Sequence, residues 1–140
     1  MLTRTYLHFT SFSYDGSLRQ TLVSSGIVQP KGLSLDARAG LVYFYDTDRH
    51  VIESVGVDGR GRHVVYTDTS AQLSGLAVTS KFIIFSDDTK PTLTRITKNG
   101  TDPLPAGPPD FPHVDELYVS EYEFNAWSCF TCVYVYLGRM

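Results

Sequence analysis

The chain has 140 residues, 42% of them hydrophobic and 13% aromatic, which suits one folded unit and is too rich in Tyr and Phe for a disordered segment. Its 12 Lys and Arg against 15 Asp and Glu give a formal net charge of −3, and no basic run reaches about five residues. These properties argue against a nucleic-acid partner and against an anionic membrane surface.

Two other features bound the class of protein. Residues 1–12 lack the continuous apolar core of a signal peptide, and the longest apolar stretch, 129–138, is well short of the ~20 residues that cross a bilayer. We therefore expect no direct membrane insertion by this segment, and either an intracellular protein or a piece of a longer secreted one. Cys129 and Cys132 are the only cysteines, too few for four thiolate ligands, so we expect no metal and no cofactor.

A repeat of 41 to 43 residues runs through the chain. The turn-forming pairs Asp15-Gly16, Asp58-Gly59 and Asn99-Gly100 have glycines 43 and 41 residues apart. "PKGLSLD" and "QLSGLAVT" keep a spacing of 43, and "VYFYD" and "IIFSD" a spacing of 41, in the same order. Three markers with one period and one order indicate a repeated structural unit.

Taken in chain order, the repeat predicts strands. Residues 9–12 before Asp15-Gly16 match 52–55 before Asp58-Gly59, so the chain opens inside a repeat at its third strand. Asp58-Gly59 and Asn99-Gly100 predict two-residue hairpin turns with positive φ at both positions. No segment has a 3.6-residue apolar period, so we expect almost no helix. The two units that follow each contain four predicted strands: 32–36, 41–46, 51–57 and 62–67, then 75–79, 82–87, 92–98 and 103–107.

Four strands in about 40 residues are typical of a β-propeller blade. We predict an all-β chain in which residues 1–119 form a propeller fragment of two to three four-stranded antiparallel blades. Residues 120–140, an apolar segment with both cysteines, match nothing earlier and are predicted to lie outside the repeat. Five prolines within 102–112 weaken the second unit's last strand, because proline cannot donate to a ladder.

These motifs resemble the YWTD, or class B, repeats of the low-density lipoprotein receptor family and of nidogen-like matrix proteins. "QPKGLSLD", "YFYD", "VIESVGVDG" and "RHVV" follow the family pattern in order, and "LSGLAV", "IFSD" and "LTRITKNG" follow it again. Phe44 and Phe85 stand at the family's Trp, which keeps an aromatic ring and loses the indole donor. The structural motif positions are Tyr43, Phe44, Asp46, Phe85 and Asp87.

The resemblance implies an extracellular, six-bladed, non-enzymatic propeller that binds protein ligands, here as part of a receptor-related or nidogen-like protein. We accordingly expect an extracellular location or a receptor ectodomain, and a need for the remaining blades. In the family the motif Asp braces neighbouring blades. A carboxylate at the end of a buried strand needs donors, so a structural role for Asp46 and Asp87 agrees with physical expectation.

Antiparallel strands within a blade place the 2–3 and 4–1 loops on one rim, which in the family is the usual ligand platform. The candidate contacts on this rim are Lys31, Asp48, Arg49, His50, Asp88, Lys90 and His113. Solvated loop charges without a ligand are the alternative for each of them.

Two further hypotheses remain open. Asn99-Gly100-Thr101 is a glycosylation sequon as well as a turn, so Asn99 is a candidate acceptor only in a secreted chain. A propeller enzyme of the metal-dependent lactonase type would need polar side chains converging on a central ion, for which Ser34, Ser74 and Asp115 are available. The first strands are mostly apolar and no catalytic motif is present, so we predict a binding module instead of an enzyme.

Overall fold

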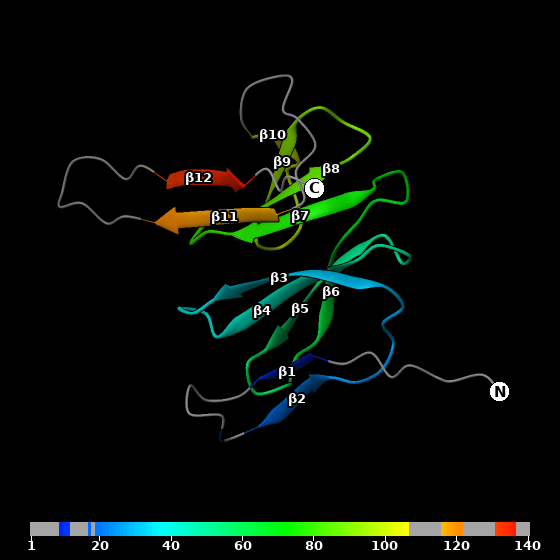
Figure 1. The fold of residues 1–140 in the computed structure, drawn as a ribbon, viewed down its shortest axis with the longest axis vertical. Coiled ribbons are helices and arrows are strands. Elements are labelled where there is room, and N and C mark those ends of the chain that lie inside the picture. Colours follow the sequence, from blue (N-terminus) through cyan, green and yellow to red (C-terminus); the bar gives the residue numbers. More distant parts are fainter. Residues whose placement is uncertain (1–8, 12–16, 18, 107–115, 122–130, 137–140) are drawn as a thin grey trace.

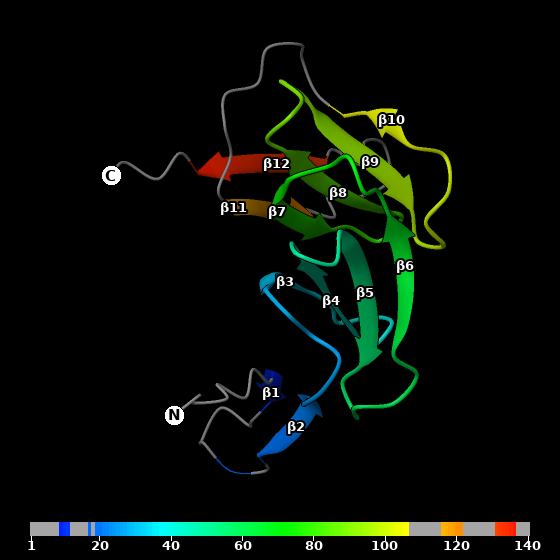
Figure 2. The ribbon, with the colours of Figure 1, turned by 90° about the vertical axis from the view of Figure 1, so that its right-hand side faces the viewer.

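The structure is a computed structural model that describes residues 9–11, 17, 19–106, 116–121 and 131–136. Within these ranges every regular element is a β-strand, as predicted, and none is a helix long and apolar enough to cross a membrane. The strands form four antiparallel sheets, two of four strands and two of two strands. Figures 1 and 2 show these sheets arranged one after another as a fan.

The two four-stranded sheets are the predicted repeat units, called here blade 1 and blade 2. In both, the strand order in the sheet follows the chain, so each is a meander of neighbouring antiparallel strands. Blade 1 consists of β3 (Pro30–Asp36), β4 (Leu41–Asp46), β5 (Val51–Gly56) and β6 (His63–Thr67). Blade 2 consists of β7 (Leu73–Val78), β8 (Phe82–Asp87), β9 (Leu93–Thr97) and β10 (Leu104–Pro105).

Two strand pairs flank the blades. The N-terminal pair is β1 (Phe9–Ser11) with β2 (Gln20–Val23), at the third-strand and fourth-strand places of the repeat. The C-terminal pair is β11 (Glu116–Glu121) with β12 (Thr131–Tyr136). β11 lies against β7 as β7 lies against β3, so β3, β7 and β11 are successive first strands around one centre. β12, from the segment predicted to lie outside the repeat, takes the place next to β11.

Two apolar layers hold the fan together. Between the blades, Tyr43, Tyr45 and Ile52 of blade 1 meet Ile83 and Phe85 of blade 2, each buried. On the other side of blade 1, Phe44 and Val55 pack against the N-terminal pair, with the rings of Phe9 and Phe44 4.8 Å apart. β4 is therefore covered on both faces, and residues 83–87 of β8 are all buried as well. Burial on both faces explains the near-continuous apolar sequences of these second strands.

The hairpin turns differ from the two-residue turns that the sequence predicts. The carbonyl of Gly56 accepts the N–H of Gly59 at 2.8 Å, the N–H of Gly56 donates to Arg60 at 2.8 Å, and only Gly59 of the Asp58-Gly59 pair has a positive φ, +79°. Thr97, Gly100 and Thr101 repeat this arrangement in blade 2. Both are three-residue turns that end in a glycine bulge, so the prediction of positive φ at Asp58 and Asn99 was wrong. Asp15-Gly16 lies outside the described residues.

Candidate ligand-binding rim

The rim predicted as a ligand platform is formed by the loops that leave the second strands and the loops that enter the first strands. The antiparallel pairing of both blades puts loops 47–50 and 88–92 on the same edge as loops 24–29 and 68–72. Loop 68–72 lies on this edge by the same argument from strand direction, although the candidate contacts predicted from the sequence include none of its residues. It contributes Asp68 and Gln72 to this edge.

Asp46 ends β4 and is fully buried beneath the rim. Its Oδ2 accepts the N–H of Val28 at 2.7 Å, and its Oδ1 accepts the N–H groups of Gln29 at 3.1 Å and Arg49 at 3.3 Å. Val28 and Gln29 belong to the loop that enters blade 1 from the N-terminal pair. The carboxylate thus joins the chain entering the blade to the end of the second strand.

Asp87 holds the corresponding place in blade 2. Its Oδ1 accepts the N–H of Gln72 at 2.9 Å and both the N–H and the hydroxyl of Thr89, at 3.0 and 2.7 Å. Among the described residues, the ammonium of Lys90, 3.1 Å away, is the one partner of Oδ2. Burial acts to raise the pKa of Asp87, but the hydrogen bonds from Thr89, Gln72 and Lys90 leave the pKa lowered.

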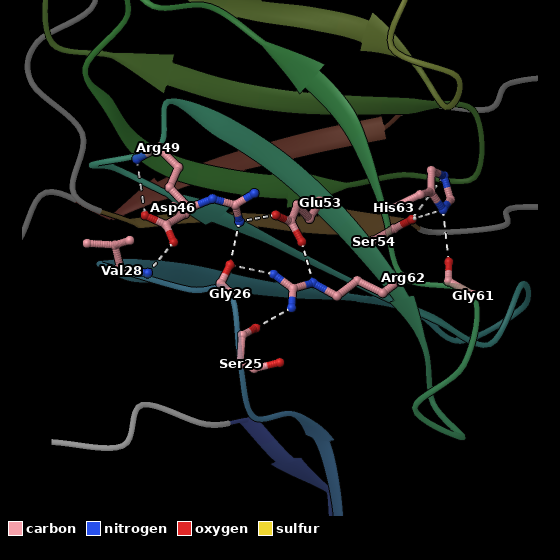
Figure 3. Close-up of polar contacts among 10 residues, drawn as sticks. All are labelled: Ser25, Gly26, Val28, Asp46, Arg49, Glu53, Ser54, Gly61, Arg62 and His63. Carbon is pink, nitrogen blue, oxygen red and sulfur yellow. Dashed lines mark hydrogen bonds and ion pairs between the residues drawn. The ribbon is translucent and has the colours of Figure 1, made fainter. Parts of the chain in front are cut away.

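A buried ion cluster lies beside Asp46, and Figure 3 shows its arrangement. Glu53, in the middle of β5, is 2% exposed and pairs with the guanidinium groups of Arg49 and Arg62, the latter at 2.5 Å. Arg62 also donates to the carbonyls of Ser25 at 2.5 Å and Gly26 at 2.8 Å, and Arg49 donates to Gly26 at 2.7 Å. Glu53 therefore receives the two charge partners that a buried carboxylate requires.

Two of the other candidate contacts, His50 and Lys90, bind groups within the rim itself. The Nδ1 of His50 lies 3.0 Å from the carbonyl oxygen of Ala71, and the residue adopts a φ of +53°. Lys90 lies between Asp87 and, at 3.7 Å, Asp68. The hydroxyl of Ser70, together with its backbone N–H and the ammonium of Lys90, lowers the pKa of Asp68, although burial and the Asp87 carboxylate act to raise it. The hydrogen bond with Asp87 raises the pKa of Lys90.

Exposed charges surround a polar pocket between the two blades. Lys31 and Thr47 of blade 1 face Gln72 and Asp88 of blade 2 across this pocket. The side chains of Lys31, Asp48 and Asp88 are exposed to solvent. His113 lies outside the described residues. This part of the rim offers charges of both signs together with backbone groups, which is chemistry suited to a polar protein surface.

The residues of the enzyme hypothesis do not converge in the described part of the chain. The hydroxyl of Ser34 accepts the N–H of Val78 at 3.0 Å in blade 2, and that of Ser74 bonds to Ser86 at 2.9 Å. Asp115 lies outside the described residues. Asn99 is exposed in its turn, where its Oδ1 accepts the hydroxyl of Thr101 at 3.1 Å. Glycosylation at Asn99 stays a prediction.

Stacked four-stranded antiparallel meanders whose first strands surround one centre define part of a β-propeller. The chain carries YWTD-type repeats, as the motifs predicted, and comparisons with known proteins confirm this. It is 31% identical to human low-density lipoprotein receptor-related protein 5 and 26% identical to the protein of Mus musculus, in each case over 90% of this chain. The match spans 9% of the length of those two relatives.

More distant similarities point the same way. Vitellogenin receptor Yl of Drosophila melanogaster is 32% identical over 54% of this chain and 4% of its own length. The crystal structure of a nidogen/laminin complex contains a chain that superposes with a TM-score of 0.67 at 19% identity, over 77% of this chain and 43% of that one. The last similarity supports the fold alone. No family model matches the chain.

Proposed function

We propose that this chain is part of an extracellular, non-enzymatic module that binds a protein ligand through the rim of the 2–3 and 4–1 loops. The observation that carries the proposal is the pocket between Lys31 and Asp88, which is bordered by exposed charges and built from both blades. A shallow site of mixed charge is suited to a protein surface, and it would gain affinity from complementary charge and from the residues at its centre. The similarity to receptor-related proteins supports an extracellular location.

Ion pairs hold the loops of this rim in place, as a preformed binding site requires. Arg49 and Lys90, two of the predicted contacts, form ion pairs with buried carboxylates and so position the loops. Lys31, Asp48 and Asp88 then remain as the contacts that a ligand would meet first. Holding the loops in place before binding reduces the entropy cost of association.

The proposal is tested by binding of the immobilised chain to fractionated secreted proteins, with the charge-reversed variant Lys31→Glu beside it. Arg60→Glu is the matched control, because Arg60 is exposed in the hairpin turn of the opposite rim. We expect Lys31→Glu to weaken a saturable interaction about tenfold while Arg60→Glu leaves it unchanged. Equal loss in both variants, or no saturable binding to any fraction, would contradict the rim as a ligand site.

A further inference from the structure

The turn between β9 and β10 contains Asn99-Gly100, the one Asn-Gly pair in the sequence. Asparagine is a thermolabile residue, because its side-chain amide can be attacked by the backbone nitrogen of the residue that follows. Glycine in that following position has no Cβ to hinder the attack. Asn99 is exposed to solvent, so water and hydroxide ions reach its amide. The turn therefore contains the two residues that this reaction needs.

The fold requires glycine at position 100. Gly100 has a φ of +81°, in the left-handed region that favours glycine. A Cβ at this position would lie 1.8 Å from the carbonyl oxygen of Val65, because the turn rests against β6 of blade 1 (Figure 2). A larger residue would push the turn of blade 2 away from blade 1. The reactive pair thus lies at a contact between the blades that depends on its glycine.

We propose that Asn99 is a site of deamidation and that the isoaspartate product weakens the contact between the two blades. A hydroxide ion takes the proton of the Gly100 N–H, and the nitrogen forms a bond to the Cγ of Asn99. The Cγ–Nδ2 bond breaks, and the departing group takes a proton from water and leaves as ammonia. The product is a cyclic imide. The glycosylation predicted for Asn99 uses the same Nδ2 atom, so the two modifications exclude each other.

Hydrolysis of the cyclic imide gives two products. Water that breaks the bond between the Gly100 nitrogen and the side-chain carbon leaves aspartate in an ordinary backbone. Water that breaks the bond between this nitrogen and the backbone carbonyl carbon of residue 99 leaves isoaspartate. The chain then runs through the former side chain, and the backbone contains an extra methylene group.

The folded turn slows the first step. The N–H of Gly100 donates to the carbonyl of Thr97 at 3.0 Å. The Oδ1 of Asn99 accepts the hydroxyl groups of Thr97 and of Thr101, the latter at 3.1 Å. Ring closure must break the first of these bonds and rotate the side-chain amide out of the others. The reaction therefore proceeds through transient opening of the turn, and its rate measures that opening.

Blade 1 shows that aspartate suits this kind of turn. Asp58 holds the corresponding place before Gly59, and its Oδ1 accepts the N–H of Arg60 at 3.0 Å. Gly59 has a φ of +79°, close to that of Gly100. Aspartate at position 99 should consequently leave the turn and its contact with blade 1 intact.

Isoaspartate at position 99 should disturb the contact between the blades. An extra methylene group directly before Gly100 displaces this residue from the carbonyl of Val65, where the space admits no additional atom. The preceding residue, Lys98, pairs with Asp36 of blade 1 at 2.5 Å, so a shift of the turn also strains this ion pair. Formation of isoaspartate would thus weaken the stacking of blade 2 on blade 1 slowly and irreversibly.

Peptide mapping by mass spectrometry tests the reaction after incubation of the chain at mildly alkaline pH, with and without urea. We expect deamidation at Asn99 to be about tenfold or more slower in the folded chain than in urea. Thr97→Val removes one hydroxyl donor to Asn99 and should speed the reaction of the folded chain about three- to tenfold, with no change in urea. Thr67→Val is the matched control, since Thr67 is exposed on β6 and should leave both rates unchanged.

Thermal denaturation of the deamidated chains tests the effect on the blades. These chains gain a negative charge and separate from the original by ion exchange, and they have the same mass and charge as the variant Asn99→Asp. We expect Asn99→Asp to melt within about 1 °C of the unmodified chain, and the isoaspartate component of the deamidated fraction to melt about 5 °C lower. Equal rates in the folded and urea-unfolded chains, no reaction at Asn99 in either, or a deamidated fraction that melts with Asn99→Asp would each overturn the proposal.

Discussion

The ammonium of Lys98 in blade 2 lies 2.5 Å from the Oδ2 of Asp36 in blade 1 and 5.3 Å from the centre of the Tyr43 ring. Asp36 ends β3 and Lys98 follows β9, so this pair joins the blades on the rim opposite the ligand-binding rim. The two side chains are 11% and 25% exposed, which places the pair between a surface ion pair and a buried one. We expect a coupling energy of about 1 kcal/mol in a double-mutant cycle of Asp36→Asn and Lys98→Met. Urea denaturation measures it, and additive effects would show that the pair contributes nothing.

The same pair predicts a pH dependence of stability. Burial acts to raise the pKa of Asp36, but the hydrogen bond from Lys98 and those from the backbone leave the pKa below its ordinary 3.8. A carboxyl whose pKa is lower in the folded state stabilises the fold at pH values above its unfolded pKa. This contribution is lost as the pH falls through the lowered pKa of the folded state. Unfolding free energies measured from about pH 6 down to about pH 2 should therefore decline less in Asp36→Asn than in the unmodified chain.

Asp46 is buried beneath the rim and Asp48 is exposed on it, and substitution distinguishes the two positions. Asp46→Ala removes the acceptor of three backbone N–H groups under the rim and should lower the free energy of unfolding by about 3 kcal/mol. Asp48→Ala, at an exposed position in the same loop, should change it by less than about 0.5 kcal/mol. Thermal and urea denaturation give both values. Similar values for the two variants would contradict the structural role that we propose for Asp46.

The sequence predicted the sheets but not the turns. Apolar runs in Leu41–Asp46 and Phe82–Asp87 identify strands buried on both faces, and one repeat period places four strands in each unit. Asp-Gly and Asn-Gly, however, are compatible with two hairpin types that differ by one residue in register. The structure places the glycine in the bulge, so that Val57 and Asp58 occupy the central turn positions with ordinary negative φ.

The ion cluster could not be predicted from spacing either. Glu53 meets Arg62 because β5 and β6 pair with a bulge between Ile52 and Glu53, and the register at such a bulge is not encoded in a repeat period. The available signal was one acidic residue inside an apolar strand. In blade 2 the corresponding residue, opposite Phe85 as Glu53 is opposite Phe44, is Thr94. The cluster is thus particular to blade 1 among the described residues. A comparison of the two repeat sequences would not have identified it, because its carboxylate has no counterpart in blade 2.

Glu53→Thr places the blade 2 residue in blade 1 and tests the cluster. Arg49 and Arg62 would lose their carboxylate partner, although both are partly exposed and can reach water. We expect the free energy of unfolding to fall by about 2 kcal/mol, below the ~3–5 kcal/mol of a fully buried broken pair. Arg62→Met/Glu53→Gln should cost less than the sum of the two single changes, since it removes both charges together. A neutral effect of Glu53→Thr in urea denaturation would contradict a stabilising cluster.

Gly32 and Gly61 separate the effect of a steric clash from the effect of backbone conformation. Both have positive φ, +52° and +66°. A Cβ on Gly32 would lie 2.3 Å from the ring of Tyr45, whose hydroxyl donates to the carbonyl of Ser74 in blade 2, whereas a Cβ on Gly61 meets nothing within 4 Å. Each alanine substitution should cost about 1 kcal/mol for the backbone, and Gly32→Ala about 1–3 kcal/mol more because Tyr45 must move.

Thermal denaturation of both alanine variants measures this difference. In Gly32→Ala the displaced ring should also lose its hydrogen bond across the blades, so the near-ultraviolet circular dichroism of tyrosine should change there and not in Gly61→Ala. Equal losses of stability in the two variants would show that the β3 bulge at Gly32 tolerates a side chain. The contact between Tyr45 and Ser74 would then contribute little to the stacking of blade 1 on blade 2.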